Sequence, residues 1–141
     1  ERQKAPGKIM NFMTALQMCT VPKISVIMRK SYGQAYLNMG GGRNSDEVAA
    51  WPTAEVSFMD PVYATKIVTW GRDASEDERS EIEAQMARDS SAFDLAEIYA
   101  VQTVIRPQDT RRYLIDMLEI HELRPTGGVG RHRMAGWPTT Y

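Results

Sequence analysis

The chain has a single cysteine, Cys19, among 141 residues, so no disulfide can form within it. This is typical of a reducing compartment, and we expect a cytoplasmic protein, or a mitochondrial-matrix protein if the source is eukaryotic. Long hydrophobic runs are also missing. The charge-free stretch 9–22 is shorter than the about 20 residues that a membrane span needs, and it contains polar side chains. We therefore expect no membrane segment.

The chain has little net charge: 17 Lys and Arg stand against 18 Asp and Glu, which gives −1. This balance provides no general attraction to nucleic acid. The tail after Glu122 is basic, but a few arginines in a glycine-rich segment do not indicate a nucleic-acid site. The acidic pairs Asp46-Glu47 and Glu76-Asp77 look like solvated charges at a turn and at a helix start. With 43% hydrophobic residues, the chain suits one globular domain.

Hydrophobic spacing predicts alternating short strands and covering helices, an α/β arrangement. Pro22 ends the first helix, Gly33 turns a strand into a short helix, and Pro61 and Pro107 each begin a helix. Ser75 to Glu78 reads as a capping box. The predicted helices cover 9–19, 34–39, 61–70, 76–88, 92–99 and 107–124, and the predicted strands cover 23–29, 49–51, 54–59 and 101–105.

The Walker, Rossmann, HExxH, CxxC and GxSxG spacings are all missing, which removes the common enzyme motifs. The most suggestive local feature is the turn at Gly33, between Tyr32 and Tyr36. A strand that turns sharply at glycine into a helix leaves backbone N–H groups unpaired, and these can stabilise a developing oxyanion. The alternative is that Gly33 serves only a tight bend.

Other candidates favour structural roles. Gly40-Gly41-Gly42 follows a helix, so a helix stop is favoured over a phosphate cradle. His121 and His132 lack a second ligand at metal spacing, so no metal site is expected. Cys19 shares the apolar face of the first helix, where a small hydrophobe is favoured over a nucleophile. The nine methionines have mostly core-like spacing.

Three segments carry a family resemblance: residues 20–36 (TVPKISVIMRKSYGQAY), 50–56 (AWPTAEV) and 107–114 (PQDTRRYL). In register along nearly the whole chain, they resemble the C-terminal half of the carboxyltransferase (β) subunit of biotin-dependent acyl-CoA carboxylases of the propionyl-CoA carboxylase β type. The resemblance implies a crotonase-like (ClpP/crotonase) α/β fold built from β-β-α units. It also implies that residues 1–141 form a C-terminal carboxyltransferase domain, cut from a longer chain that assembles into homo-oligomers.

The activity implied by the resemblance is transfer of a carboxylate from carboxybiotin to an acyl-CoA of the acetyl-CoA or propionyl-CoA kind. In that family the backbone N–H groups of a Gly-Gly-Ala-Tyr turn hold the biotin ureido oxygen. Gln34 and Ala35 inherit this donor role here, and Gly33, Tyr36 and Leu37 are the implied substrate-binding residues. Gln34 replaces the second glycine of the turn, and its side chain would narrow the pocket if the backbone there required positive φ.

The resemblance also implies partners. The acyl-CoA site belongs to an N-terminal carboxyltransferase half, which this chain lacks, and no Ala-Met-Lys-Met biotin attachment segment is present. Biotin must therefore arrive on a biotin carboxyl carrier or biotin carboxylase subunit, and the isolated chain should be inactive. Two alternatives stay open: a subunit of a biotin-dependent acyl-CoA decarboxylase, and a structural or oligomerisation module without activity of its own.

Overall fold

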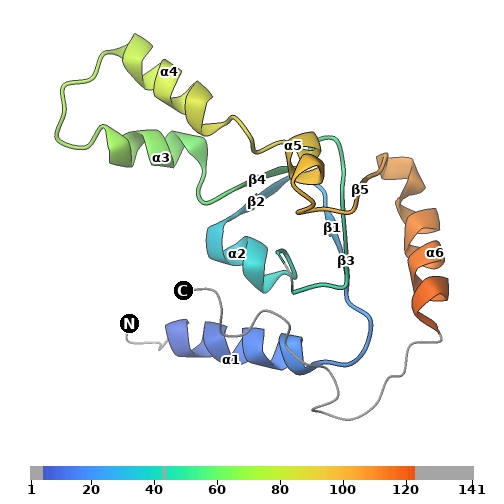
Figure 1. Cartoon of the computed structure of the whole chain (residues 1–141). Coiled ribbons are helices and arrows are strands. Elements are labelled where there is room, and N and C mark those ends of the chain that lie inside the picture. The colour runs from blue at the N-terminus through green and yellow to red at the C-terminus, as the bar shows by residue number, and fades with distance from the viewer. Residues whose placement is uncertain (1–4, 43, 123–141) are drawn as a thin grey trace.

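The computed structural model describes residues 5–42 and 44–122, so the predictions for His132 and the basic tail lie outside the described residues. Short strands alternate with helices, which confirms the predicted α/β class (Figure 1). The elements in chain order are α1 (Ala5–Met18), β1 (Ile24–Ile27), β2 (Lys30–Tyr32), α2 (Gly33–Asn38), β3 (Glu47–Ala50), β4 (Glu55–Ser57), α3 (Pro61–Val68), α4 (Glu76–Met86), α5 (Ala92–Glu97), β5 (Thr103–Val104), the 3₁₀ turn η1 (Pro107–Asp109) and α6 (Thr110–Glu122).

Two consecutive strand–strand–helix units form the centre of the molecule, β1–β2–α2 and β3–β4–α3. Their first strands pair in parallel, beginning with Ile24 opposite Glu47, and β5 joins the other edge of β3. Their second strands also pair in parallel, with Lys30 opposite Glu55, in a separate two-stranded sheet. The repeated unit confirms the expected β-β-α construction.

The core lies around β3, the central strand of the larger sheet. Val48, Ala49 and Ala50 have no exposed surface, and the small alanines let neighbouring elements approach closely. Gln102 fixes the next strand onto β3, because its Oε1 accepts the Val48 N–H at 2.7 Å and its own N–H donates to the Val48 carbonyl at 2.9 Å. Other members of this core are Ile27, Ala54, Val56, Ala92, Leu95 and Val101.

Charged residues fix the entry to the larger sheet. Asp46 Oδ2 accepts the backbone N–H of Lys23 at 2.8 Å and lies 3.6 Å from its Nζ. Glu47 lies beside His121 of α6, with Oε1 3.5 Å from Nε2. The prediction that Asp46 and Glu47 are solvated turn charges is therefore wrong, because both carboxylates are half-buried against cationic or imidazole partners.

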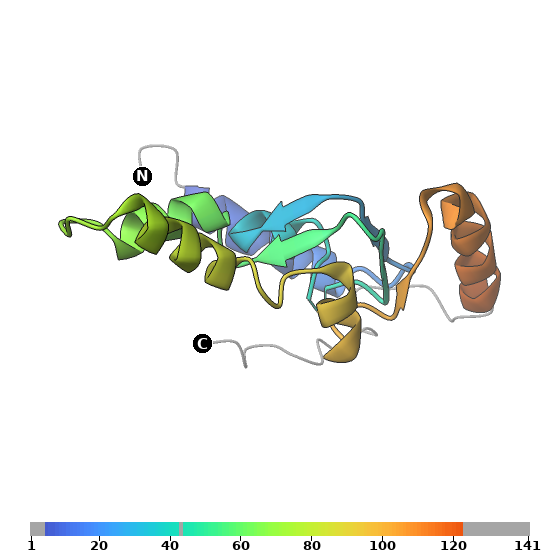
Figure 2. The ribbon, with the colours of Figure 1, turned by 90° about the horizontal axis from the view of Figure 1, so that it is seen from above.

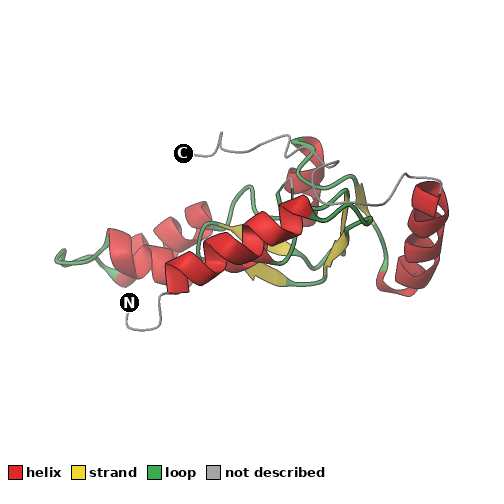
Figure 3. Ribbon diagram, turned by 90° about the horizontal axis from the view of Figure 1, so that it is seen from below, coloured by secondary structure: helices red, strands yellow, loops and turns green. Residues whose placement is uncertain are grey.

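Helix α1 packs on α2, and in the view from below it crosses in front of the strands (Figure 3). Its predicted apolar face is only partly buried: Ile9, Met13 and Leu16 are half-buried, whereas Phe12 is 52% exposed. Cys19 is also exposed, so the prediction of a buried cysteine is wrong. The helix ends at Met18, which leaves Cys19 in the following loop.

Apolar side chains remain uncovered on the projecting elements. The α3–α4 pair extends from one side of the central strands, and α6 lies on the other (Figure 2). Among the large exposed side chains are Phe58 and Trp70, each 84% exposed, and Ile120, at 66%. The methionines do not fill the core as predicted, since Met10, Met18, Met28, Met39 and Met86 are all exposed. Exposed apolar surface of this kind marks sites of protein contact.

Among the described residues, no helix combines the length and apolar character needed to cross a membrane.

Side-chain caps begin helices α3, α4 and α5. Ser75 accepts the Glu78 N–H at 3.2 Å, which confirms the predicted start of α4, but the reciprocal capping box lies instead between Ser91 and Asp94 at the start of α5. Asp60 caps α3 by accepting the Val62 N–H at 3.0 Å. Each cap satisfies an N–H group that has no partner within its own helix.

Glycine is required where β2 turns into α2. Gly33 has a φ of 55°, and a Cβ placed on it would lie 2.8 Å from the carbonyl oxygen of Phe58. Side chains of L-residues rarely adopt this φ, and the neighbouring backbone leaves no space for one. The sharp turn predicted at Gly33 is therefore confirmed.

Replacing Ser91 with Ala should lower the free energy of unfolding by about 1 kcal/mol, because α5 loses its cap. Hydrogen bonds from Ser91 hold the pKa of Asp94 below its usual range. Because the pKa of Asp94 is lower in the folded state, its carboxylate stabilises the fold at pH values above the unfolded pKa of about 3.9. This stabilisation is lost as the pH falls through the lowered folded-state pKa. The difference in the free energy of unfolding between wild type and Ser91→Ala should therefore become smaller at acidic pH, as measured by urea unfolding. An equal loss for Ser80→Ala, an exposed serine within α4, would contradict this.

Gly33→Ala should destabilise the chain more than Gly71→Ala. Both glycines have positive φ, 55° and 74°, so both substitutions carry the cost of a left-handed residue, about 1–2 kcal/mol. Only at Gly33 does the new Cβ meet backbone, since nothing lies within 4 Å at Gly71. Urea unfolding of both variants tests this, and equal losses would show that the contact with Phe58 has no energetic effect.

Candidate functional site

The turn between β2 and α2 leaves the start of the helix without a side-chain cap. Tyr32, in extended conformation, is the N-cap of α2, and no side chain caps the helix. Gln34 and Ala35 occupy the first turn and are exposed, and among the described residues their N–H groups donate to no backbone carbonyl. Helix N-termini carry partial positive charge, so this turn can accept an oxyanion.

A comparison with the neighbouring helices makes the open turn distinctive. Within α2–α5, each helix except α2 has a side chain that caps its first turn: Asp60, Ser75 or Ser91. Helices α2 and α3 follow paired parallel strands, so both begin at the same edge of the smaller sheet. One of these two equivalent starts thus has a side-chain cap, and the other has none.

The side chain of Gln34 points away from the open N–H groups. Its Nε2 donates to Asn38 Oδ1 at 3.1 Å, one turn further along α2, and to Met13 Sδ of α1 at 3.3 Å. The positive φ belongs to Gly33, and Gln34 has no such strain. Glutamine is therefore compatible with this position, and its side chain links α2 to α1.

Tyr36 and Leu37, the other predicted substrate-binding residues, lie one turn further on and are half-buried. The ring of Tyr36 packs closely against Gly41 and the hydrophobic core. Leu37 Cδ2 would lie 3.4 Å from a Cβ on Gly42. The structure therefore brings Gly33, Gln34 and Ala35 together at the turn, with Tyr36 and Leu37 packed behind them.

A polar cluster that was not predicted from the sequence lies beside the turn. The Tyr32 hydroxyl donates to Glu55 Oε2 at 2.8 Å, and Lys30 Nζ lies 3.2 Å from Asp60 Oδ2. Burial, followed by the hydrogen bond to Glu55, raises the pKa of Tyr32 to about 12, so the phenol stays protonated at neutral pH. Strand β2 was not predicted either, because its three residues contain no apolar β-branched side chain. Side chains along a strand alternate between its two faces, so Lys30 and Tyr32, two residues apart on β2, lie on the same face.

The remaining candidates have structural roles. Side chains on Gly40 and Gly41 would collide with Ser25, Ser45 and Tyr36, and the glycines follow the end of α2, which confirms a helix stop. No group of His, Cys, Asp and Glu in residues 5–42 and 44–122 is arranged to hold a metal ion.

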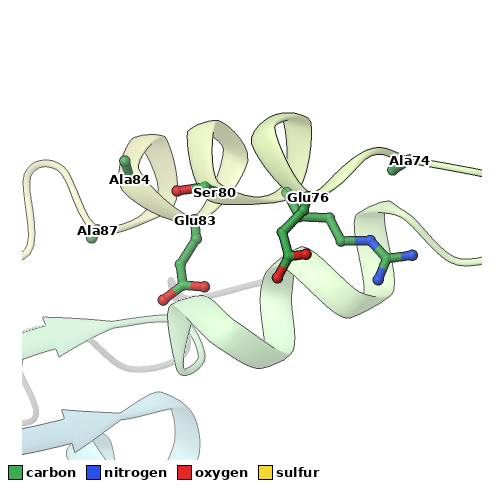
Figure 4. Close-up of a pocket in the computed structure, with 7 residues that line it drawn as sticks. Ala74, Glu76, Ser80, Glu83, Ala84 and Ala87 are labelled. Carbon is green, nitrogen blue, oxygen red and sulfur yellow. The ribbon is translucent and has the colours of Figure 1, made fainter.

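A surface hollow runs along α4, remote from the turn in sequence and in space (Figures 1 and 4). The carboxylates of Glu76 and Glu83 point from α4 toward α3, and small side chains form most of the remaining wall (Figure 4). The lining residues are Ala74, Glu76, Arg79, Ser80, Glu83, Ala84 and Ala87.

Known proteins with similar sequences belong to one family of carboxyltransferases. The carboxyl transferase domain family matches residues 7–133. The methylmalonyl-CoA decarboxylase subunit alpha of Veillonella parvula is 37% identical over 105 residues, which cover 74% of this chain and 20% of that protein. The mitochondrial propionyl-CoA carboxylase beta chain of Rattus norvegicus is 36% identical over 107 residues, 75% of this chain and 19% of that one. The chain thus spans about a fifth of the length of these relatives.

A solved structure shows the same architecture. The transcarboxylase 12S hexamer assembly, with hydrolysed methylmalonyl-coenzyme A bound, superposes with a TM-score of 0.77 at 29% identity and covers 89% of this chain and 25% of that one. This similarity confirms the crotonase-like α/β fold and the predicted family resemblance. The paired β-β-α units and the family match over residues 7–133 lead to one conclusion: the chain belongs to the carboxyl transferase domain family.

Proposed function

We propose that this chain is the biotin-side part of a carboxyltransferase that moves a carboxylate from carboxybiotin to an acyl-CoA, of the acetyl-CoA or propionyl-CoA kind. Family membership and the named relatives support the reaction class. The observation that carries the proposal is the uncapped start of α2, where Gln34 and Ala35 are exposed and no side chain caps the helix. We further propose that residues 1–141 form a C-terminal domain of the parent protein.

The turn suits the charge that this reaction develops. Carboxybiotin supplies an activated carboxylate, and loss of that carboxylate places negative charge on the ureido group. In our proposal the N–H groups of Gln34 and Ala35 donate to the ureido oxygen and stabilise this charge. Gly33 supplies the backbone angle that aims them, while Tyr36 and Leu37 shape the wall behind. Each pre-aimed donor of this kind contributes on the order of 3–4 kcal/mol to catalysis.

The reverse direction has support of its own. A relative that is 37% identical is a methylmalonyl-CoA decarboxylase subunit. There the same donors would stabilise the ureido group while it receives the carboxylate. Carboxylase and decarboxylase therefore share the role proposed for Gln34 and Ala35 and differ in the direction of transfer. Because an enzyme accelerates both directions of a reversible transfer, the sequence of the N-terminal half and of the neighbouring subunits separates the two.

The partners follow from the part of the reaction that this chain does not carry. We propose that an N-terminal carboxyltransferase half supplies the acyl-CoA site, and that a biotin carboxyl carrier or biotin carboxylase subunit delivers the biotin. The exposed apolar side chains of α1, α3 and α6 favour assembly with these parts and into a homo-oligomer. Because a relative is mitochondrial, we place the protein in the mitochondrial matrix if its source is eukaryotic, and otherwise in the cytoplasm.

The isolated 141-residue chain should not carboxylate propionyl-CoA or acetyl-CoA, because the proposed acyl-CoA site lies on the N-terminal carboxyltransferase half. The measurement is product formation from carboxybiotin by this chain and by the full-length parent. Turnover by the isolated chain would contradict the proposed division of the active site. An inactive full-length parent would favour the structural-module alternative.

In the full-length parent, Ala35→Pro should reduce turnover by about 10²–10³-fold, because proline removes one N–H donor. The loss should fall on kcat rather than on KM, since the donor acts mainly as charge develops. Ala35→Val, which keeps the N–H but crowds the turn, should also reduce kcat.

Glu76→Pro is the matched control, since it places proline at the first position of the exposed helix α4, where proline is tolerated. It should retain the parent's kcat. A folded Ala35→Pro variant with normal kcat would show that the Gly33 turn has only a structural role.

A further inference from the structure

One face of the smaller sheet carries a row of polar side chains. Lys30 and Tyr32 lie two residues apart on β2, so they share a face, and Glu55 stands opposite Lys30 on β4. The Tyr32 hydroxyl donates diagonally across the strands to Glu55 Oε2, at 2.8 Å. Lys30 Nζ lies over the Tyr32 ring, 5.8 Å from its centroid.

This row joins the starts of both helices. Tyr32 is the N-cap of α2, and Lys30 connects the row to Asp60, the N-cap of α3, with Nζ 3.2 Å from Oδ2. The other carboxylate oxygen of Asp60 accepts the Val62 N–H at 3.0 Å. The open helix start is thus tied through side chains to the capped helix start beside it.

Stability alone gives little reason for such a row. The side chain of Lys30 is 49% exposed, and ion pairs this exposed contribute little to folding. The row does restrain the residue immediately before Gly33. Since the N–H groups of Gln34 and Ala35 follow directly, the orientation of Tyr32 helps to set their direction.

We propose that Tyr32 and Glu55 are positioning residues, whose hydrogen bond holds the end of β2 and so aims the N–H groups of Gln34 and Ala35. This inference rests on the proposed function of the turn. Neither side chain needs to contact substrate, because each acts through the backbone. Small errors in such aim are costly: a displacement of about 1 Å can reduce turnover by about 10²-fold.

The first test uses nuclear magnetic resonance of the 141-residue chain and needs no activity. Tyr32→Phe and Glu55→Leu should each move the backbone amide resonances of Gln34 and Ala35. Tyr63→Phe is the matched control, because it removes the phenol hydroxyl of a 65% exposed tyrosine on α3. Amide resonances of Gln34 and Ala35 that stay in place in Tyr32→Phe would overturn the positioning role.

The second test uses kinetics of the full-length parent. Tyr32→Phe should lower kcat about tenfold, with the KM for acyl-CoA and the urea midpoint unchanged. Glu55→Gln keeps an acceptor oxygen and should restore most of the kcat that Glu55→Leu loses. The double variant Tyr32→Phe/Glu55→Leu should be no slower than either single variant, because both break one bond.

The outcomes distinguish this inference from the function on which it rests. A normal kcat in Tyr32→Phe, together with a large loss in Ala35→Pro, overturns the positioning role and leaves the oxyanion turn in place. Losses that multiply in the double variant also overturn it, because the two side chains would then act separately. A normal kcat in Ala35→Pro overturns the turn itself, and the positioning role with it.

Discussion

Parallel pairing between two consecutive strand–strand–helix units is the constraint on which the rest of this structure depends. The first strands pair in the larger sheet and the second strands in the smaller one, so each unit repeats the path of the one before it. As a result, α2 and α3 begin at the same edge. The two helix starts nevertheless differ in their caps: Asp60 caps α3, and no side chain caps α2.

The difference between these two starts comes from a few residues. Gly33 takes a positive φ against the carbonyl of Phe58, which brings β2 into α2 without a capping residue. At the corresponding place before α3, Asp60 and Pro61 form an ordinary capped start. A carboxylate cap at α2 would occupy the N–H groups and repel an oxyanion, so an uncapped start is what anion binding at this turn requires.

Much of this arrangement could be predicted from local sequence. The turn at Gly33, the helix start at Pro61 and the glycine stop after α2 depend on the backbone angles that glycine and proline allow, and all three predictions are confirmed. The predictions that failed depend on tertiary packing. The spacing of apolar residues predicted a buried Phe12 and Cys19, but it does not reveal that α1 packs mainly on a short helix. Asp46 and Tyr32 found partners, Lys23 and Glu55, that only strand register brings near. The donor role of Gln34 and Ala35 came from the family resemblance, since spacing alone favoured a simple bend at Gly33.

The proposed contact between this turn and biotin is tested most directly by a crystal structure of the full-length parent with biotin bound. We expect the ureido oxygen within about 3 Å of the backbone nitrogens of Gln34 and Ala35. The Gln34 side chain should remain turned toward Asn38 and Met13. Biotin bound at another place, or these two N–H groups bonded to a carbonyl of the parent protein, would contradict the account.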